Sequence, residues 1–121
     1  VNASVWENFT RWRSERDEGD RTVAQFGTPE THPETWARLS PRTYFADIQA
    51  PVLLFQGSAD KDVPEAWSDG LAVDLEAAGR DIEYVEYPGE GHEFGPKWSD
   101  FMARAAAFFK RELTSQPAPS R

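Results

Sequence analysis

The sequence contains no cysteine and few cationic side chains, and these absences exclude several classes of protein. Without cysteine the chain forms no disulfide and no thiolate metal site, which fits a cytoplasmic protein. Its 13 Lys and Arg stand against 21 Asp and Glu, for a formal net charge of −8. A chain so acidic offers no basic stripe for nucleic-acid phosphates. His32 and His92 lie too far apart for a metal-ligand spacing. We therefore expect no metal, no cofactor and no nucleic-acid partner.

Long apolar runs are also missing. No stretch approaches the roughly 20 residues of a membrane-spanning helix. The N-terminus lacks the basic and then apolar regions of a signal peptide, so we expect no membrane partner. The composition is 39% hydrophobic and 13% aromatic, which is too apolar for a disordered chain and typical of one globular domain. The sequence starts at Val1 rather than Met, and we expect it to be cut from a longer protein.

Residues 1–50 are predicted to be mostly helical. Apolar side chains recur at spacings of three and four from Trp6, which predicts a helix as far as Glu18 that Gly19 would stop. Residues 1–5 are partly β-branched and resemble the end of a strand.

The second part of this segment begins with weak periodicity in residues 20–31, which predicts no regular element. Proline at the first helical position predicts short helices after His32 and after Ser40, with His32 as a surface cap. We expect most of the aromatic side chains here to be core, although such a segment could also cover a substrate pocket.

The second half reads as strand, helix, strand and helix. A continuous apolar run over residues 52–56 predicts a buried strand. A helix with an apolar stripe begins at Pro64 or Glu65 and ends at Gly79. The alternating residues 81–87 predict a more exposed strand.

The last helix is expected to begin at Ser99 or Asp100 and to extend to Leu113. Its apolar face would consist of Phe101, Ala105, Phe108 and Phe109. Residues 114–121 are predicted to be a disordered tail. Trp6, Trp12, Trp36 and Trp67 are expected in the core, and Trp98 over the loop of His92.

Asp60 and His92 follow the two predicted strands, and we expect them to meet. Strand, helix and strand of these lengths form a βαβ unit with parallel strands, and functional groups gather beyond the carboxyl ends of such strands. A carboxylate bonded to one imidazole nitrogen fixes the tautomer of a general base. On spacing alone the catalytic interpretation is the weaker one, because an acidic loop after a strand is common and a lone His is usually a surface or hydrogen-bonded polar residue. Asp62 is the alternative acid, although Asp60 fits the spacing from Gly57 better. Glu90 and Glu93 flank His92 as loop carboxylates.

Four motifs follow one another across residues 40–113. They are Ser40-Pro41-x-x-Tyr44, Ile48-x-x-Pro51-Val52-Leu53-Leu54, Gly57-x-x-Asp60-x-x-Val63-Pro64 and Tyr87-Pro88-Gly89-Glu90-Gly91-His92-x-Phe94. In order and spacing they strongly resemble the C-terminal third of the α/β-hydrolase fold. The match is closest to the prolyl oligopeptidase family, which includes the acylaminoacyl peptidases and dipeptidyl aminopeptidases. The resemblance implies that Asp60 is the catalytic acid and His92 the catalytic base of a peptidase or esterase.

The resemblance also implies an architecture. The fold class would be α/β, a partial α/β-hydrolase fold whose parallel strands are flanked by helices. Residues 1–113 would be the C-terminal portion of the catalytic domain. Within it, 1–50 would form a helical lid or pocket segment, and 51–113 the strand–helix–strand–helix portion.

The nucleophile of the family is missing. It lies in G-x-S-x-G, a motif that occurs nowhere in this sequence, and the oxyanion-hole loop that precedes it is absent as well. Ser58 lies in the loop of the acid but reads as a turn residue bonded to its own backbone. Ser4 lacks the flanking glycines. We expect the chain alone to be inactive.

Two hypotheses remain. In the first, the chain supplies Asp and His to a serine hydrolase that acts on peptides or small esters, as a fragment, a cleavage product or a truncated gene product. Alternatively it is a non-catalytic module. In both cases an unpaired strand edge predicts a homodimer or association with the missing N-terminal part.

Overall fold

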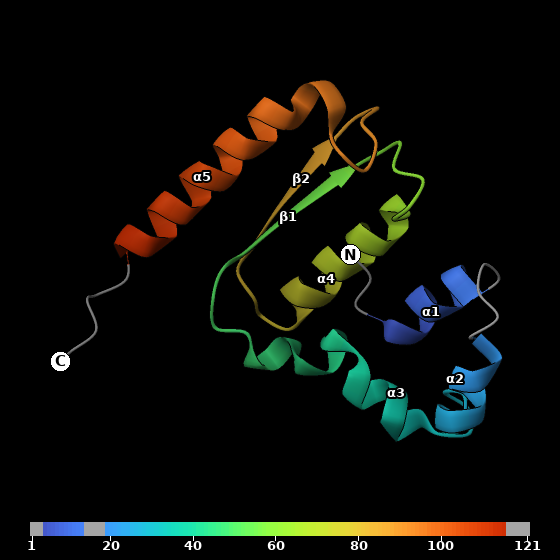
Figure 1. Ribbon diagram of the computed structural model, residues 1–121. Coiled ribbons are helices and arrows are strands. Elements are labelled where there is room, and N and C mark those ends of the chain that lie inside the picture. Colours follow the sequence, from blue (N-terminus) through green and yellow to red (C-terminus); the bar gives the residue numbers. More distant parts are fainter. Residues whose placement is uncertain (1–3, 14–18, 116–121) are drawn as a thin grey trace.

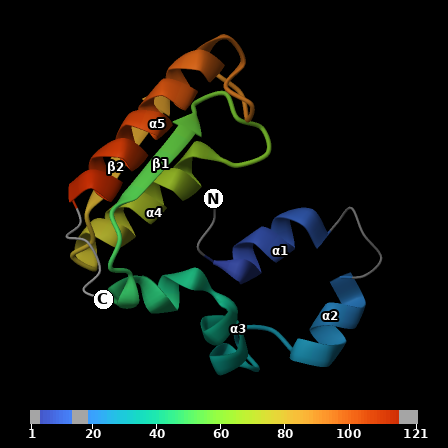
Figure 2. The ribbon, with the colours of Figure 1, turned by 60° about the vertical axis from the view of Figure 1, so that its left-hand side comes forward.

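Two parallel strands between helices form the centre of the computed structural model, which describes residues 4–13 and 19–115 (Figure 1). The strands lie between α4 on one face and α5 on the other (Figures 1 and 2). The N-terminal helices form an arm beside α4. The elements in order are α1 (Val5–Arg13), α2 (Gly19–Phe26), α3 (Pro33–Leu39), the 3₁₀ helix η1 (Pro41–Asp47), β1 (Val52–Gly57), α4 (Glu65–Ala77), β2 (Ile82–Tyr87), the 3₁₀ helix η2 (Gly95–Lys97) and α5 (Trp98–Ser115).

The register of the two strands brings their carboxyl ends level. Val52 pairs with Ile82 at one end and Gly57 with Tyr87 at the other, so both following loops leave the same edge of the sheet. The predicted strands and their parallel arrangement are therefore confirmed. Within the described residues the sheet has two strands, so the edge of β1 opposite β2 has no partner strand there.

The face of the sheet under α4 holds a hydrophobic core that is mostly aliphatic. Its buried members are Phe45, Leu54, Leu71, Ala72 and Leu75. The predicted stripe of α4 accounts for this, because residues three or four apart share one helix face.

The crossover helix ends as its sequence predicts. Gly79 has φ +72° and donates to the carbonyl of Glu76, while Arg80 donates to the carbonyl of Leu75. This pair of bonds is a Schellman motif, which favours glycine at the left-handed position. The end of α4 at this motif turns the chain into β2.

The opposite face holds an aromatic cluster beneath α5. The ring of Phe55 lies 4.7 Å from that of Phe101, and the ring of Phe94 lies 5.2 Å from Tyr87 and 5.0 Å from Phe101. Phe94 belongs to the loop that carries His92. The cluster therefore attaches this loop to the sheet and to α5.

Several predictions for the N-terminal segment are wrong. Residues 20–31 were expected to lack an element, yet α2 occupies Gly19–Phe26, so Gly19 begins a helix instead of stopping one. Val5 is helical rather than extended. Residues 1–3 and 14–18, including Glu18, lie outside the described part of the chain. The periodicity missed α2 because two apolar residues are too few to reveal a stripe.

The two proline-led helices are confirmed as α3 and η1, with His32 and Ser40 at their N-caps as predicted, but neither side chain makes a capping bond. His32 occupies the N-cap of α3 without a side-chain cap bond. The hydroxyl of Ser40 does not cap η1: it donates to the carbonyl of Trp36 and accepts from the N–H of Val5. Ser40 thus joins α1 to α3. Trp36 is buried and Trp6 and Trp67 are half-buried, while the side chain of Trp12 is outside the description.

The last helix is longer than predicted and more exposed. It begins at Trp98 and includes Thr114, which was assigned to the tail. Phe101, Ala105 and Phe108 face the sheet, but Phe109 is 61% exposed and does not belong to the buried face. Residues 116–121 lie outside the described chain. No helix in the described portion has the length and apolar character needed to cross a membrane.

Candidate active site

The loop after β1 fixes the carboxylate of Asp60 with its own backbone. One oxygen, Oδ1, accepts the N–H of Asp62 at 2.8 Å and that of Val63 at 2.9 Å. An Asp side chain bonded to the backbone two and three residues ahead stabilises a tight turn. The carboxylate is 6% exposed, so these two bonds hold a nearly buried charge in one orientation.

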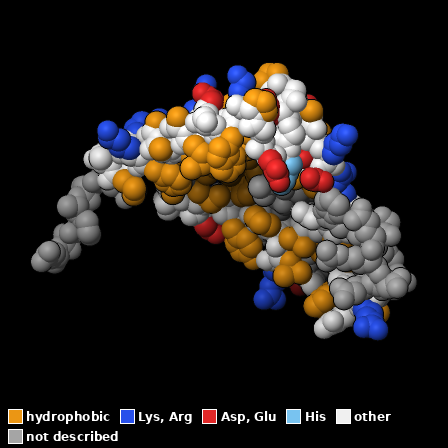
Figure 3. Space-filling model, turned by 45° about the horizontal axis from the view of Figure 1, so that its top comes forward, with side chains coloured by type: hydrophobic (Ala, Val, Ile, Leu, Met, Phe, Trp, Pro, Cys, Tyr) orange, Lys and Arg blue, Asp and Glu red, His pale blue; other side chains and the backbone are white. Residues whose placement is uncertain are grey.

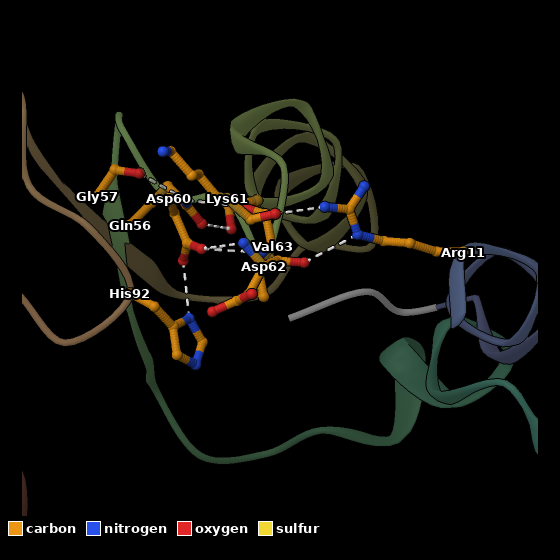
Figure 4. Close-up of polar contacts among 9 residues, drawn as sticks. Arg11, Gln56, Gly57, Asp60, Lys61, Asp62, Val63 and His92 are labelled. Atoms are coloured by element: carbon orange, nitrogen blue, oxygen red, sulfur yellow. Dashed lines mark hydrogen bonds and ion pairs between the residues drawn. The ribbon is translucent and has the colours of Figure 1, made fainter. Parts of the chain in front are cut away.

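The second oxygen of Asp60 faces His92 (Figure 4). Nδ1 of His92 lies 2.8 Å from Oδ2 of Asp60. The ring is 56% exposed, and its other nitrogen points away from the carboxylate. A proton on Nδ1 leaves Nε2 as the acceptor, which is the tautomer that a general base requires. The structure therefore brings together the two residues that the sequence selected.

Hydrogen bonds join the loop after β1 (residues 58–64, the acid loop) to the loop after β2 (residues 88–94, the histidine loop). Ala59 donates its N–H to the carbonyl of Glu90, and Gly89 donates to the hydroxyl of Ser58 at 2.8 Å. Ser58 was expected to bond to its own turn. It accepts instead from the histidine loop, so its hydroxyl holds the two loops together.

Gly57 allows the loops to approach so closely. A Cβ atom at this position would lie 2.4 Å from the carbonyl oxygen of Glu90 and 2.6 Å from that of Gly91. Both neighbours are backbone atoms that cannot rotate away. A side chain on Gly57 would therefore push the histidine loop off the acid loop.

A buried polar pair, Gln56 and Ser68, holds the C-terminal end of the acid loop at Val63. The amide of Gln56 is 2% exposed and donates to the carbonyl of Val63 at 3.1 Å, and its oxygen accepts from Ser68 on α4. The sequence interpretation missed this pair. Its signal is the Gln that follows four apolar residues in a strand buried on both faces, where an amide needs partners.

The electrostatics of the pair favour its charged form. Burial acts to raise the pKa of the Asp60 carboxyl, but bonds from the Val63 N–H, the His92 ring and the Asp62 N–H hold that pKa below its usual value. The bond to Asp60 raises the pKa of His92, and the charges of Asp60, Asp62 and Glu93 act in the same direction against partial burial. The imidazolium that forms after proton uptake is thus stabilised.

An open depression lies beside the ring of His92. It is lined by His92, Glu93, Gly95 and Trp98. Trp98 is 52% exposed and contacts Phe101, so it stands next to the histidine loop rather than fully over it. A substrate group that reaches His92 would therefore meet a carboxylate and an indole.

The other candidate residues, Asp62, Ser4 and His32, make structural contacts of their own. Asp62, the alternative acid, gives its N–H to Asp60 and does not bond to the ring. Ser4 caps α1 by accepting the N–H of Glu7. His32 is exposed and bonds to Thr31. None of these three bonds to His92 among the described contacts.

Asp60, Asp62 and His92 are also the described residues that come nearest to a metal-ligand set, with one ligand atom from each within 4.8 Å of the others. The Nδ1 atom of His92 and both oxygens of Asp60 already bond to protein groups. A cation bound through Nδ1 of His92 would displace the bond between His92 and Asp60. The donor set therefore fits a proton-transfer pair better than a metal site.

Comparison with known proteins agrees with the geometry. The model of the prolyl oligopeptidase family matches residues 5–116. A putative carboxymethylenebutenolidase from Methylorubrum extorquens is 40% identical over 55 residues, which cover 46% of this chain and 19% of that protein. Dipeptidyl aminopeptidase BIII from Pseudoxanthomonas mexicana is 32% identical over 77 residues, which cover 62% of this chain and 11% of that protein.

Among solved structures, the acylaminoacyl peptidase from Pyrococcus horikoshii matches with a TM-score of 0.71 and 17% identity. The match covers 99% of this chain and 20% of that one. The fold is accordingly a part of the α/β-hydrolase fold. The chain spans a fifth or less of the length of each of these relatives.

Proposed function

The chain belongs to the prolyl oligopeptidase family, a family of hydrolases, and on that premise we propose that it supplies the acid and base of a serine hydrolase. The observation that carries the proposal is the 2.8 Å bond between Nδ1 of His92 and Oδ2 of Asp60 at the carboxyl edge of parallel strands. The substrate would be a peptide or a small ester. A dipeptidyl aminopeptidase among the relatives supports the peptide.

Each residue has a defined role in this chemistry. Nε2 of His92 takes the proton of a serine hydroxyl as the serine oxygen attacks the substrate carbonyl, and returns that proton to the leaving group. Asp60 keeps the proton of His92 on Nδ1 and stabilises the imidazolium between these steps. Water then repeats the cycle on the acyl-enzyme and releases the acid product.

The nucleophile and the oxyanion hole would come from another segment. The sequence has no G-x-S-x-G motif, and Ser58 and Ser4 are both engaged in structural bonds. We therefore propose that the isolated chain is inactive and that its partner is the preceding part of the catalytic domain. The edge of β1 opposite β2, which has no partner strand among residues 4–13 and 19–115, offers a place for a further parallel strand.

The test is complementation. The chain is co-expressed with a segment that carries the missing strands and a G-x-S-x-G serine, such as one encoded upstream of Val1, and hydrolysis of a p-nitrophenyl ester is measured. Activity should appear only when both pieces are present. His92→Ala should lower kcat/KM by about 10³-fold or more, because the general base is gone.

His32→Ala is the matched control, since it removes the other histidine of the chain from an exposed position. It should leave kcat/KM unchanged. Equal activity of the His92→Ala and unsubstituted complexes would overturn the proposed roles.

A second candidate function is a non-catalytic module that associates with itself. The observation in its favour is the exposed apolar surface of α5, where Met102 is 49%, Phe109 61% and Leu113 71% exposed. Figure 3 shows hydrophobic side chains gathered over a broad area of one face. A start codon close to Val1 would favour this candidate, and an upstream reading frame with G-x-S-x-G would favour the hydrolase.

A further inference from the structure

Arg11 of α1 reaches the loop that holds Asp60 (Figure 4). Its Nε donates to the carbonyl of Asp62 at 3.0 Å, and a second guanidinium nitrogen donates to the carbonyl of Lys61. These partners lie 51 and 50 positions away in the sequence. Arg11 and His92 approach the loop from opposite sides. Arg11, on the N-terminal arm, therefore binds the acid loop on the side opposite His92.

The two carbonyls belong to the peptide units that bind Asp60. The carbonyl of Lys61 shares a planar peptide unit with the N–H of Asp62, and the carbonyl of Asp62 shares one with the N–H of Val63. Those two N–H groups are the donors to Oδ1 of Asp60. Because a peptide unit is rigid, a donor that fixes its oxygen also aims its N–H. The guanidinium and the carboxylate thus bond to opposite ends of the same two peptide units.

We propose that Arg11 is a positioning residue for Asp60, acting through these two peptide units to hold Oδ1 and thereby present Oδ2 to His92. Its importance for catalysis rests on the proposed function, but the coupling itself is a property of this chain. Hydrogen bonds in series also polarise one another, so the guanidinium strengthens both N–H bonds to the carboxylate.

Other contacts hold α1 in place when Arg11 is changed. The ring of Trp6 packs 4.8 Å from Trp36, and that of Phe9 lies 5.8 Å from Trp36. The guanidinium of Arg11 itself lies 5.7 Å from the ring centre of Trp67 on α4, and this contact is lost when Arg11 is changed. The fork of an arginine can bridge two carbonyls at once, whereas a lysine ammonium acts as a single point. Arg11→Lys therefore keeps the charge and removes the bridge.

Two effects of removing Arg11 have opposite signs on the pKa of His92. Loss of a positive charge would raise that pKa by direct electrostatics. Loss of the bridge would loosen Asp60 and lower it, because the bond to Asp60 is the main cause of its elevation. The other charges that act on the ring, Asp62 and Glu93, stay in place. The sign of the change therefore separates positioning from simple charge.

The experiment is an NMR titration of the His92 ring in the 121-residue chain. In Arg11→Gln the pKa of His92 should fall, but by less than it falls in Asp60→Asn, where the whole interaction with the carboxylate is weakened. Arg11→Lys should resemble Arg11→Gln. The amides of Asp62 and Val63 should exchange with solvent at least about threefold faster in both variants. If Arg11→Gln fails to fold, Arg11→Lys carries the same test.

Arg38→Gln is the matched control, since it removes an exposed arginine from α3. It should change neither the pKa of His92 nor the exchange of the two amides. A rise or no change in the pKa with Arg11→Gln, or wild-type behaviour of Arg11→Lys, would overturn the positioning role. If Asp60→Asn leaves the pKa of His92 unchanged, the proposed pair fails. If the pKa of His92 falls in Asp60→Asn but not in Arg11→Gln, the pair stands and only the positioning role of Arg11 is refuted.

Discussion

At the scale of single residues, the site depends on a few polar atoms that each have one task. Asp60 divides its two oxygens between its own loop and His92. The carboxylate is nearly buried and the ring is more than half exposed. A buried acid that orients an accessible base matches what proton transfer to a substrate requires.

The pair should make stability depend on pH in a defined window. The folded pKa of Asp60 is lowered, so its contribution is present above its unfolded pKa of about 3.9 and is lost as pH falls through the folded value. The folded pKa of His92 is raised, so its contribution is present below about 6.5 and is lost as pH rises through the folded value. Both contributions coincide between these values.

Urea unfolding from pH 3 to 9 measures this window. The difference in unfolding free energy between the unsubstituted chain and His92→Ala should be largest between about pH 4 and 6.5 and should shrink on both sides. A difference that grows above pH 8 would contradict the raised pKa of His92.

Gly57 lies where the acid loop and the histidine loop approach most closely, so a side chain there should disturb the site. Gly57→Ala should cost about 1–3 kcal/mol of unfolding free energy, because the added Cβ meets two carbonyl oxygens below 3 Å. It should also lower the pKa of His92 by separating the loops. Gly91→Ala is the control, since a Cβ there meets nothing within 4 Å. Urea unfolding and NMR titration of both variants test this, and equal effects would refute the steric explanation.

At the scale of elements, the crossover helix sets the direction of β2 and hence the place of His92. Its end depends on a left-handed residue at Gly79, while Gly70 lies inside the helix in open space. The two glycines of one helix therefore have opposite requirements.

Alanine at these two positions should shift stability in opposite directions. Gly79→Ala should cost about 1 kcal/mol, because an L side chain disfavours φ near +72°. Gly70→Ala should gain about 0.5–1 kcal/mol from helix propensity. Thermal or urea unfolding of each variant gives the sign, and a gain for Gly79→Ala would contradict the assigned Schellman motif.

At the scale of the whole molecule, the described residues cover the two faces of the sheet but leave one edge of β1 and part of α5 uncovered. Exposed apolar side chains on α5 favour association with another chain or segment, and so does the edge of β1 that no described strand pairs with. Such a surface would be covered in a longer catalytic domain.

The isolated chain should therefore associate at micromolar concentration. Sedimentation velocity should show a dimer or larger species, and the double variant Phe109→Glu and Leu113→Glu should shift it toward monomer by placing charges on the apolar patch. Val73→Glu is a control on the exposed face of α4. A well-folded monomer of the unsubstituted chain would contradict this expectation.

Local signals in the sequence were enough to predict the central strand–helix–strand unit and the two residues of the pair, Asp60 and His92. Periodicity, capping and short motifs are local signals, and Asp60 and His92 each lie within a few residues of a strand end. A parallel register then brings the strand ends together. The catalytic roles of the pair remain predictions.

Three features of the site follow only from how the elements pack. They are the oxygen of Asp60 that faces the ring, the contact of the two loops at Ser58 and Gly57, and the bonds of Arg11 to a loop 50 positions away. The packing also decided that Phe109 faces outward. These features depend on the angle at which distant elements pack, and a pattern read within one element carries no information about that angle.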